Sequence, residues 1–481
     1  MKIFFTLLFY LAANYTSGQG YNISLNTPSY RSGMAYLTYY MGKNLNVEDS
    51  AIVSGKGTAV FKGERILPGG IYAIVFPGRN ITAEFLIDKE QQINIIADTT
   101  DLVNMIVQGS PENLLFQEYK KYITVIGSQL QKEKTAYINS RSKKDSLLHE
   151  ANYIKYNKEL NDYRYNITKN HSTSMMASLL SAMKEPPYPT KIPVTQQDSI
   201  DNYNFYKEHY WDGITFMDGR ILRTPFFLPK LERYYREIMP QTPDSIIKDA
   251  DYKLLLARSN PEMYKFLLNW ITDEYINPRY MGQDAVFVHL FDKYHSKGMS
   301  PWLNEKQMET ITRRAYMLMA NLVGEKAANL DMIDSSGKPV PLYDLKADYT
   351  VVIFWDPTCG HCKDELPKID SIYRASWKAE SVKLYAVLTE SHKDEWINYI
   401  KEHNLGDWTH VYQTKEMAEA ENAAQRPGFR QLYDITQTPA LYLLDKEKKI
   451  IGKKLTWSQL NDLLYVKIKT DKNKINKVSG K

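Results

Sequence analysis

The chain has 481 residues, a formal net charge of +5 and two cysteines. Six lysines against one aspartate in residues 466–481 account for that charge, so the rest of the chain is neutral overall, which argues against nucleic acid as a partner. A chain of this length has room for about three domains with ample cores, so it does not need disulfide bonds for stability.

A secretory signal is predicted over residues 1–18. One Lys precedes an apolar run over residues 3–13, small residues follow it, and Gly18 or Gln19 marks the expected cleavage point. An apolar run of about eleven residues is too short for a bilayer, which needs roughly twenty. We therefore expect an exported protein, periplasmic or elsewhere in the cell envelope, with no stable membrane span.

Residues 19–105 are predicted to form a small antiparallel, sandwich-like β domain. Short apolar runs are divided by Gly, Pro and Asn, and the apolar residues of 85–97 alternate with the period of two that is typical of half-buried strands. Ser110 and Pro111 then fit the cap and first position of a helix. An α-helical domain is predicted over residues 106–322, and its aromatic stripes indicate core packing, with a binding groove as the alternative.

An α/β domain is predicted over residues 323–466. Apolar, β-rich runs at residues 350–355, 382–388 and 440–445 alternate with helical stretches. This alternation predicts a central sheet that helices cover on both faces. The Lys-rich tail over residues 467–481 is predicted to be a solvated, frayed end.

Both cysteines lie in the segment FWDPTCGHCKDELP, where the first strand of the α/β domain passes into a helix. Free N–H groups and the dipole at a helix start favour a thiolate, so Cys359 is the expected nucleophile and Cys362 the resolving thiol. His361 is expected to stabilise the thiolate form and so to make the disulfide more oxidising.

Two other interpretations of the cysteine pair are weaker. A structural disulfide across a two-residue loop removes little entropy from the unfolded chain. A zinc site usually needs four ligands, and besides the pair only His361 and Asp364 could be recruited nearby. We therefore expect no metal and no cofactor other than a redox-active disulfide between Cys359 and Cys362.

The segment resembles the active site of the thioredoxin superfamily, specifically the exported TlpA/ResA-like thiol-disulfide oxidoreductases of the Bacteroidetes type. Trp355 precedes the cysteines, Pro367 falls in the following helix, and Thr438 and Pro439 precede a strand, as in that family. The resemblance implies a thioredoxin-like fold, a cis Pro439 against the cysteine pair, and substrate contacts from Trp355 and Thr438. The regions upstream resemble DUF4369 and DUF5106 domains.

The chain departs from classical thioredoxin at two places. Ile353 stands where thioredoxin has a buried acid, whereas Glu365, three residues after Cys362, matches the ResA-like branch and is implied to relay protons to Cys362. The interval from Cys362 to Pro439 is also longer than in a minimal thioredoxin, and an inserted strand and helix would account for it. A peroxiredoxin pattern is not matched, because its Pro and Thr are spaced differently before the cysteine.

These features predict an exported enzyme that exchanges disulfides with envelope client proteins carrying thiols or disulfides. A membrane electron relay or an oxidant is the expected second partner, since the active-site pair must be recharged. The alternative is an envelope binding or scaffold protein whose helical domain binds a ligand or partner. His392, His403 and His410 show no ligand spacing and are interpreted as surface or loop polar groups.

Overall fold

The structure is a computed structural model that describes residues 20–479, so the predicted signal at residues 1–18 lies outside the described residues. The chain divides into two compact units, Met1–Met239 with Lys253–Tyr264 and Pro240–Tyr252 with Lys265–Lys481. This division passes through the predicted helical domain, and the boundaries of the three predicted domains stay a prediction. Within residues 20–479, no helix is both long and apolar enough to cross a membrane.

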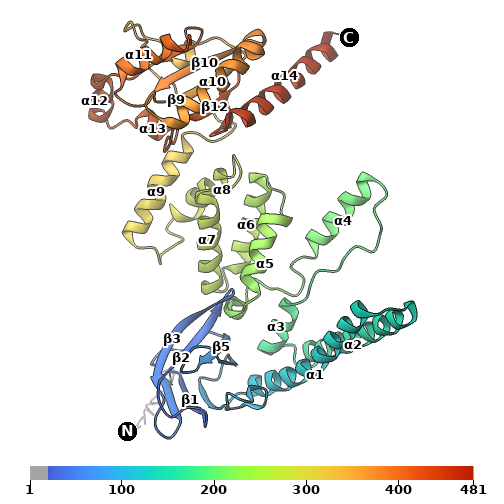
Figure 1. Cartoon of the computed structure of the whole chain (residues 1–481). Coiled ribbons are helices and arrows are strands. Elements are labelled where there is room, and N and C mark those ends of the chain that lie inside the picture. Colours follow the sequence, from blue (N-terminus) through green and yellow to red (C-terminus); the bar gives the residue numbers. More distant parts are fainter. Residues whose placement is uncertain (1–19, 480–481) are drawn as a thin grey trace, which may run out of the picture. The chain divides into compact units, whose positions relative to one another are not determined.

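The first unit begins with two four-stranded sheets that share one core (Figure 1). Their inward side chains include Ile23 and Phe61 from one sheet and Tyr72 and Phe85 from the other, all fully buried. The antiparallel expectation is confirmed except for one parallel pair, β1 with β7. The first sheet has the strand order β4 (Thr58–Lys62), β1 (Asn22–Asn26), β7 (Gln92–Ile96) and β8 (Ile106–Gln108). The second sheet has the strand order β3 (Asn44–Ile52), β2 (Met34–Met41), β5 (Gly70–Val75) and β6 (Thr82–Ile87).

Helices follow, as the sequence predicts. Ser110 caps the first of them by accepting a hydrogen bond from the Asn113 amide at 3.4 Å, and Pro111 occupies its first turn. The helices of the first unit are α1 (Pro111–Asn139), α2 (Lys143–Asn170), α3 (Met175–Ala182), α4 (Gln196–Glu208) and α5 (Phe227–Arg233), while α6 (Pro243–Ala257) and α7 (Pro261–Ile276) contribute residues to both units.

The second unit contains a five-stranded sheet covered on both faces. Alternate residues of β9 (Tyr349–Trp355) enter two separate cores, Ile353 facing one and Phe354 the other, and every residue of the strand is buried. The strands lie in the order β11 (Thr409–Val411), β10 (Val382–Leu388), β9, β12 (Ala440–Leu444) and β13 (Ile450–Lys453). The first three are parallel, and β12 is antiparallel to both neighbours.

The helices of this unit are α8 (Asp284–Leu290), α9 (Glu305–Met319), α10 (Gly360–Ala375), α11 (Lys393–Glu402), α12 (Lys415–Ala423), α13 (Phe429–Leu432) and α14 (Trp457–Ser479). The long interval between Cys362 and Pro439 contains strand β11 and helices α12 and α13 in addition to β10 and α11. The inserted strand and helix that the sequence suggested are therefore present.

The expectation of a frayed tail after residue 466 is wrong, because α14 continues to Ser479. Leu460 and Leu464 of this helix are fully buried in the core beside α10, and Ile468 packs against the same core. Lys472 adds an ion pair with Glu380 at 2.7 Å. Apolar residues four apart thus extend the helix into the Lys-rich segment.

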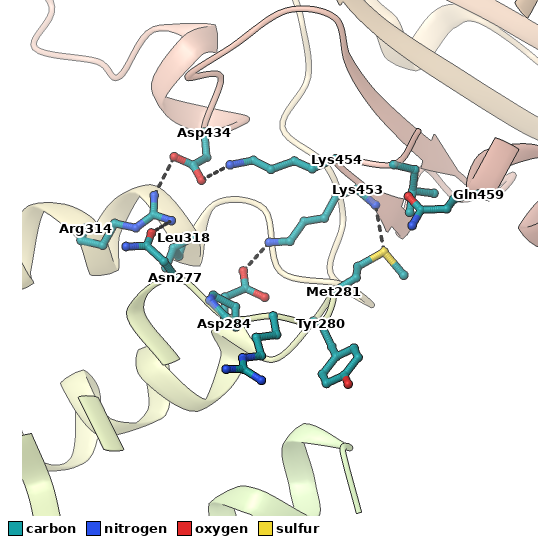
Figure 2. A pocket seen from close by; sticks show the side chains of 14 residues that line it. Asn277, Tyr280, Met281, Asp284, Arg314, Leu318, Asp434, Lys453, Lys454 and Gln459 are labelled. Carbon is teal, nitrogen blue, oxygen red and sulfur yellow. Dashed lines mark hydrogen bonds and ion pairs between the residues drawn. The ribbon is translucent and has the colours of Figure 1, made fainter. Parts of the chain in front are cut away.

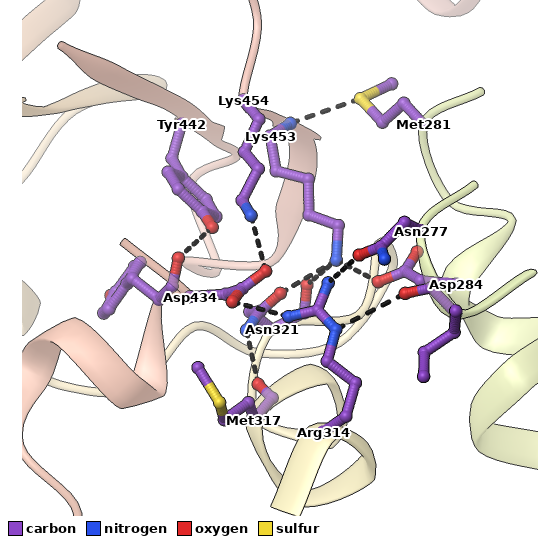
Figure 3. A network of polar contacts seen from close by, with 12 residues as sticks. Asn277, Met281, Asp284, Arg314, Met317, Asn321, Asp434, Tyr442, Lys453 and Lys454 are labelled. Carbon is purple, nitrogen blue, oxygen red and sulfur yellow. Dashed lines mark hydrogen bonds and ion pairs between the residues drawn. The ribbon is translucent and has the colours of Figure 1, made fainter. Parts of the chain in front are cut away.

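A cluster of buried charges joins helices α8 and α9 to strand β13. Lys453 forms an ion pair with Asp284 and donates to the carbonyl and side-chain oxygens of Asn321, both at 2.8 Å. Nearby, Arg314 of α9 pairs with the fully buried Asp434 at 2.7 Å (Figure 3). An open cavity of about 350 Å³ lies beside this cluster (Figure 2), and none of its lining residues comes from the cysteine segment.

Candidate active site

The end of β9 and the start of α10 position the two cysteines. The chain leaves the sheet at Trp355, turns through Asp356, and returns as Cys359, whose amide donates to the Asp356 carbonyl at 3.2 Å. Cys359 is the N-cap residue of α10, and its sulfur accepts a hydrogen bond from the Cys362 amide at 3.4 Å. One sulfur therefore sits where the free N–H groups of the helix stabilise negative charge.

The two thiols, which are not joined by a disulfide in this structure, have opposite environments. Burial by itself raises the pKa of Cys359, but hydrogen bonds from the Thr438 side chain and from the Cys362 amide outweigh it and hold that pKa below its usual value. Cys362 is 1% exposed, and burial raises its pKa to about 12. The half-exposed Cys359 is thus the better nucleophile near neutral pH.

The loop before β12 closes the site from the other side. The peptide bond between Thr438 and Pro439 is cis, as the resemblance implies. The Thr438 carbonyl accepts a hydrogen bond from the Cys359 thiol at 3.3 Å, so this loop lies directly against the first cysteine. Thr438 and Pro439 are both partly exposed.

Three other residues predicted at the site, Trp355, His361 and Glu365, differ in how far they are buried. Trp355 is fully buried, so the structure does not support a substrate contact from this side chain. His361 is exposed on the first turn of α10. Glu365 is partly exposed and pairs with Lys368 at 3.6 Å, and no contact of its carboxylate with Cys362 is found among the described residues. The roles predicted for His361 and Glu365 stay predictions.

Sequence reasoning missed a buried carboxylate that shapes the turn before the cysteines. Asp356 is 3% exposed and accepts from the Thr358 amide at 2.8 Å, from the Thr358 hydroxyl, and from His392 Nδ1 at 3.1 Å. Burial raises the pKa of Asp356, but these hydrogen bonds, first that of the Thr358 hydroxyl, outweigh it and lower that pKa. The Asp-Pro-Thr sequence, typical of a turn closed by an Asp side chain, was the available signal.

Two of the three histidines interpreted as surface groups have hydrogen-bond partners in the protein. His392 bonds Asp356, and that hydrogen bond raises the pKa of His392. His410 lies on β11, where burial lowers its pKa to about 4 and its Nε2 donates to the Leu405 carbonyl at 2.9 Å. The interpretation is therefore wrong for His410 and incomplete for His392.

We expect Asp356→Asn to lower the pKa of His392 toward its ordinary value of 6.5, because the hydrogen bond to a carboxylate is the largest cause of the shift. In the wild type the raised pKa means that this pair stabilises the fold fully below 6.5 and loses its effect as the pH rises through the raised value. NMR titration of the imidazole signals measures the change.

Asp334→Asn is the matched control for that titration. Asp334 closes a similar turn by accepting from the Ser336 amide at 2.9 Å and the Lys338 amide at 3.0 Å, and no contact joins it to His392 among the described residues. The His392 signal should titrate in this variant as it does in the wild type. An equal shift in both variants would show that Asp356 does not act through its direct bond.

Metal ligation finds no support in the described part of the chain. Within residues 20–479, no group of three or more His, Cys, Asp or Glu side chains is arranged to hold a metal ion. The groups around Cys359 and Cys362 instead provide hydrogen-bond donors. They leave the Cys359 thiol partly exposed and bury the Cys362 thiol. This arrangement suits exchange between thiols and disulfides.

Comparison with known families assigns all three regions. Residues 323–453 match the AhpC/TSA family, and residues 21–116 and 164–321 match the domains of unknown function DUF4369 and DUF5106. Thiol-disulfide oxidoreductase ResA of Bacillus cereus is 24% identical over 131 residues, which are 27% of this chain and 68% of that protein. ResA of Bacillus subtilis is 25% identical over 128 residues, which are 64% of that protein.

The C-terminal domain is thioredoxin-like. It matches the AhpC/TSA family and is similar to the ResA thiol-disulfide oxidoreductases, so the resemblance seen in the cysteine segment is confirmed, as are the resemblances to DUF4369 and DUF5106 upstream. A thioredoxin-like protein of Bacteroides caccae aligns with 59% of this chain and 98% of its own, at 21% identity and a TM-score of 0.45. A domain of a possible thiol-disulfide isomerase of Cytophaga hutchinsonii aligns with 32% of this chain and 97% of its own, at 37% identity and a TM-score of 0.28.

Proposed function

We propose that this protein is an exported thiol-disulfide oxidoreductase that exchanges disulfides with client proteins of the cell envelope through its Cys-Gly-His-Cys segment. The observation that carries the proposal is the contrast between the two thiols of the thioredoxin-like domain. Cys359 is half-exposed at a helix start with a lowered pKa, whereas Cys362, one turn later, is buried with a raised pKa. An attacking thiol and a resolving thiol require this contrast.

In the reducing direction, the Cys359 thiolate attacks one sulfur of a client disulfide. The client disulfide breaks, one client thiolate leaves and takes up a proton, and Cys359 is joined to the other client sulfur. Cys362 then loses its proton and attacks the Cys359 sulfur, which closes the Cys359–Cys362 disulfide and releases the second client thiol. Two electrons pass from the cysteine pair to the client, and the reverse sequence oxidises a client.

The location and the recharging partner are part of the proposal. The apolar segment at residues 3–13 supports export, and an envelope enzyme of this class needs an electron relay or an oxidant to reset its cysteine pair. Cell fractionation followed by N-terminal sequencing tests the location. Material that starts at Met1 and stays in the cytoplasm would contradict it.

Catalysed reduction of insulin by dithiothreitol tests the activity. We expect the purified full chain to accelerate precipitation of the reduced insulin chains and Cys359→Ser to lose the acceleration, because this variant lacks the attacking sulfur. If the wild type does not exceed the rate of dithiothreitol alone in this assay or in the reverse, oxidising assay, the binding or scaffold function becomes the better explanation.

A further inference from the structure

Cys362 must give up a proton during each turnover. Its sulfur is enclosed in the core, and burial raises its pKa to about 12, so the thiolate that closes the disulfide is scarce near neutral pH. Around the sulfur, Cys359 and Thr438 provide hydrogen-bonding groups, together with the backbone of Asp356. None of these is a free side-chain base in the interior, so the proton needs a route to water.

Tyr399 of helix α11 lies in the same core as Cys362. Its ring packs on Trp355, the last residue of β9, with the ring centres 5.3 Å apart. The side chain is 9% exposed, and its hydroxyl is buried without a hydrogen-bond partner in the protein. A buried hydroxyl left unpaired is costly and calls for an explanation.

The same tyrosine also lines an open cavity of about 480 Å³ beside the cysteine segment. Pro357 and Thr358, which directly precede Cys359, and Lys363, which directly follows Cys362, line this cavity too. The Tyr399 side chain therefore reaches from the core that holds Cys362, where its hydroxyl is buried, to an open hollow at the edge of the active site.

The charge on Cys362 acts on Tyr399 directly. Burial is the larger cause of the raised pKa of Tyr399, and the negative charge of the Cys362 thiolate raises it further. A thiolate at Cys362 thus favours the protonated hydroxyl, which is the form that donates a hydrogen bond. The phenol stays neutral while it accepts one proton and releases another.

Neighbouring side chains add further unpaired polar atoms to this part of the core. Trp355 Nε1, Trp396 Nε1 and His410 Nδ1 are also buried without a hydrogen-bond partner in the protein. The ring of His410 lies 6.4 Å from that of Trp355 and 6.1 Å from that of Trp396, so these atoms belong to one packed group of rings. Donors and an acceptor gathered in one place are what a proton path through bound water requires.

We propose that the Tyr399 hydroxyl is the proton relay for Cys362, joining the buried thiol to the cavity beside Pro357 and Lys363. The inference rests on the proposed function and adds a residue to its second step. The proton of Cys362 passes toward Tyr399 Oη, while the hydroxyl proton of Tyr399 passes toward the cavity through water bound among the buried polar atoms around it. Tyr399 is unchanged afterwards, and Cys362 is left as the thiolate that attacks the mixed disulfide.

The outer end of this route is polar. Glu395 and Glu402 of α11 and Lys363 of α10 line the cavity, and the His403 ring stacks on Tyr399 with the ring centres 4.0 Å apart. These groups and the water among them can take up or supply the transferred proton. Glu365, the relay implied by the family resemblance, instead pairs with Lys368 and does not line the cavity.

The test separates the two chemical steps in the full-length reduced protein. Excess aromatic disulfide whose released thiolate is coloured reports attack by Cys359 as a first phase, which depends on reagent concentration. Resolution by Cys362 appears as a second phase, which does not. We expect Tyr399→Phe to leave the first phase within about twofold and to slow the second by about 10²-fold, the usual contribution of a positioned acid or base.

The pH profile distinguishes a relay from a packing role. Between about pH 6 and pH 9, the second phase of Tyr399→Phe should rise about tenfold per pH unit, because hydroxide then removes the proton, whereas the wild type should rise less steeply. Tyr412→Phe is the matched control: Tyr412 packs against the same core, its hydroxyl accepts from Lys393 at 2.7 Å, and it does not line the cavity. Both phases of this control should match the wild type.

Each other outcome decides against the relay in a recognisable way. An unchanged second phase in Tyr399→Phe overturns it, and a second phase slowed only by Glu365→Gln assigns the proton transfer to Glu365. A Tyr399→Phe protein in which both phases slow equally, with the wild-type pH profile, shows a structural role. If the wild type itself releases no second thiolate, the proposed oxidoreductase function fails, and the relay fails with it.

Discussion

Replacing Cys362 with Ser should leave the protein covalently attached to its clients. Attack by Cys359 needs only the first sulfur, which sits at the start of α10 with a lowered pKa, so the mixed disulfide still forms. Its resolution needs the second sulfur, and the Ser hydroxyl cannot replace it. Cells that express Cys362→Ser should therefore accumulate adducts that are visible on non-reducing gels and disappear with dithiothreitol.

Cys359→Ser is the matched control, and it should accumulate few adducts or none. Its remaining thiol at Cys362 is buried and has a pKa raised to about 12, so it reaches a client poorly and is rarely ionised. Equal trapping by both variants would contradict the assignment of attacker and resolving thiol. Mass spectrometry of the Cys362→Ser adducts would identify the clients.

The parts of this site that could be predicted from the sequence are local. A Cys pair two residues apart after an apolar strand places the first sulfur at a helix start, and the structure has Cys359 as the N-cap of α10. Ser110 and Pro111 predicted the start of α1 in the same way. In such cases a few neighbouring residues carry both the signal and the geometry.

The contact between Asp356 and His392 could not be predicted locally, because the two residues are 36 apart. They meet since β9 and β10 are parallel neighbours, with Trp355 opposite Leu388, so the loops after both strands leave the sheet at the same edge. A sequence-based prediction of this strand pairing would also have predicted that the two residues lie close together.

The burial of particular side chains was the other feature that could not be predicted from the sequence. Trp355 ends a strand whose every residue is buried, and a Trp beside a cysteine pair is as compatible with core packing as with a client contact. The tail after residue 466 was predicted to be frayed because of its charge. However, Leu460, Leu464 and Ile468 are spaced four residues apart, which predicts one buried helix face. In both places the choice depends on which neighbours cover the side chain, and these come from distant parts of the chain.

Lys453→Met should destabilise the unit that holds the thioredoxin-like domain by about 3–5 kcal/mol, the usual cost of removing one partner of a buried ion pair. Lys453 is 7% exposed and Asp284 is 3% exposed, so the variant leaves a carboxylate in the interior without its counter-charge (Figure 3). Asn321 also loses both hydrogen bonds that the Lys453 ammonium donates. Urea unfolding followed by tryptophan fluorescence measures the change.

Two further variants separate the charge from the packing. Lys453→Met with Asp284→Leu removes both charges and should recover a large part of the lost stability, because well-packed apolar residues can replace a buried ion pair at little cost. Lys415→Met removes one partner of an exposed pair with Glu419 and should leave the unfolding midpoint unchanged. If the single Lys453 variant unfolds at the wild-type midpoint, the cluster between α8, α9 and β13 does not hold these elements together. If the double variant is less stable than the single one, the lost energy comes from packing around Asp284 and not from an uncompensated charge.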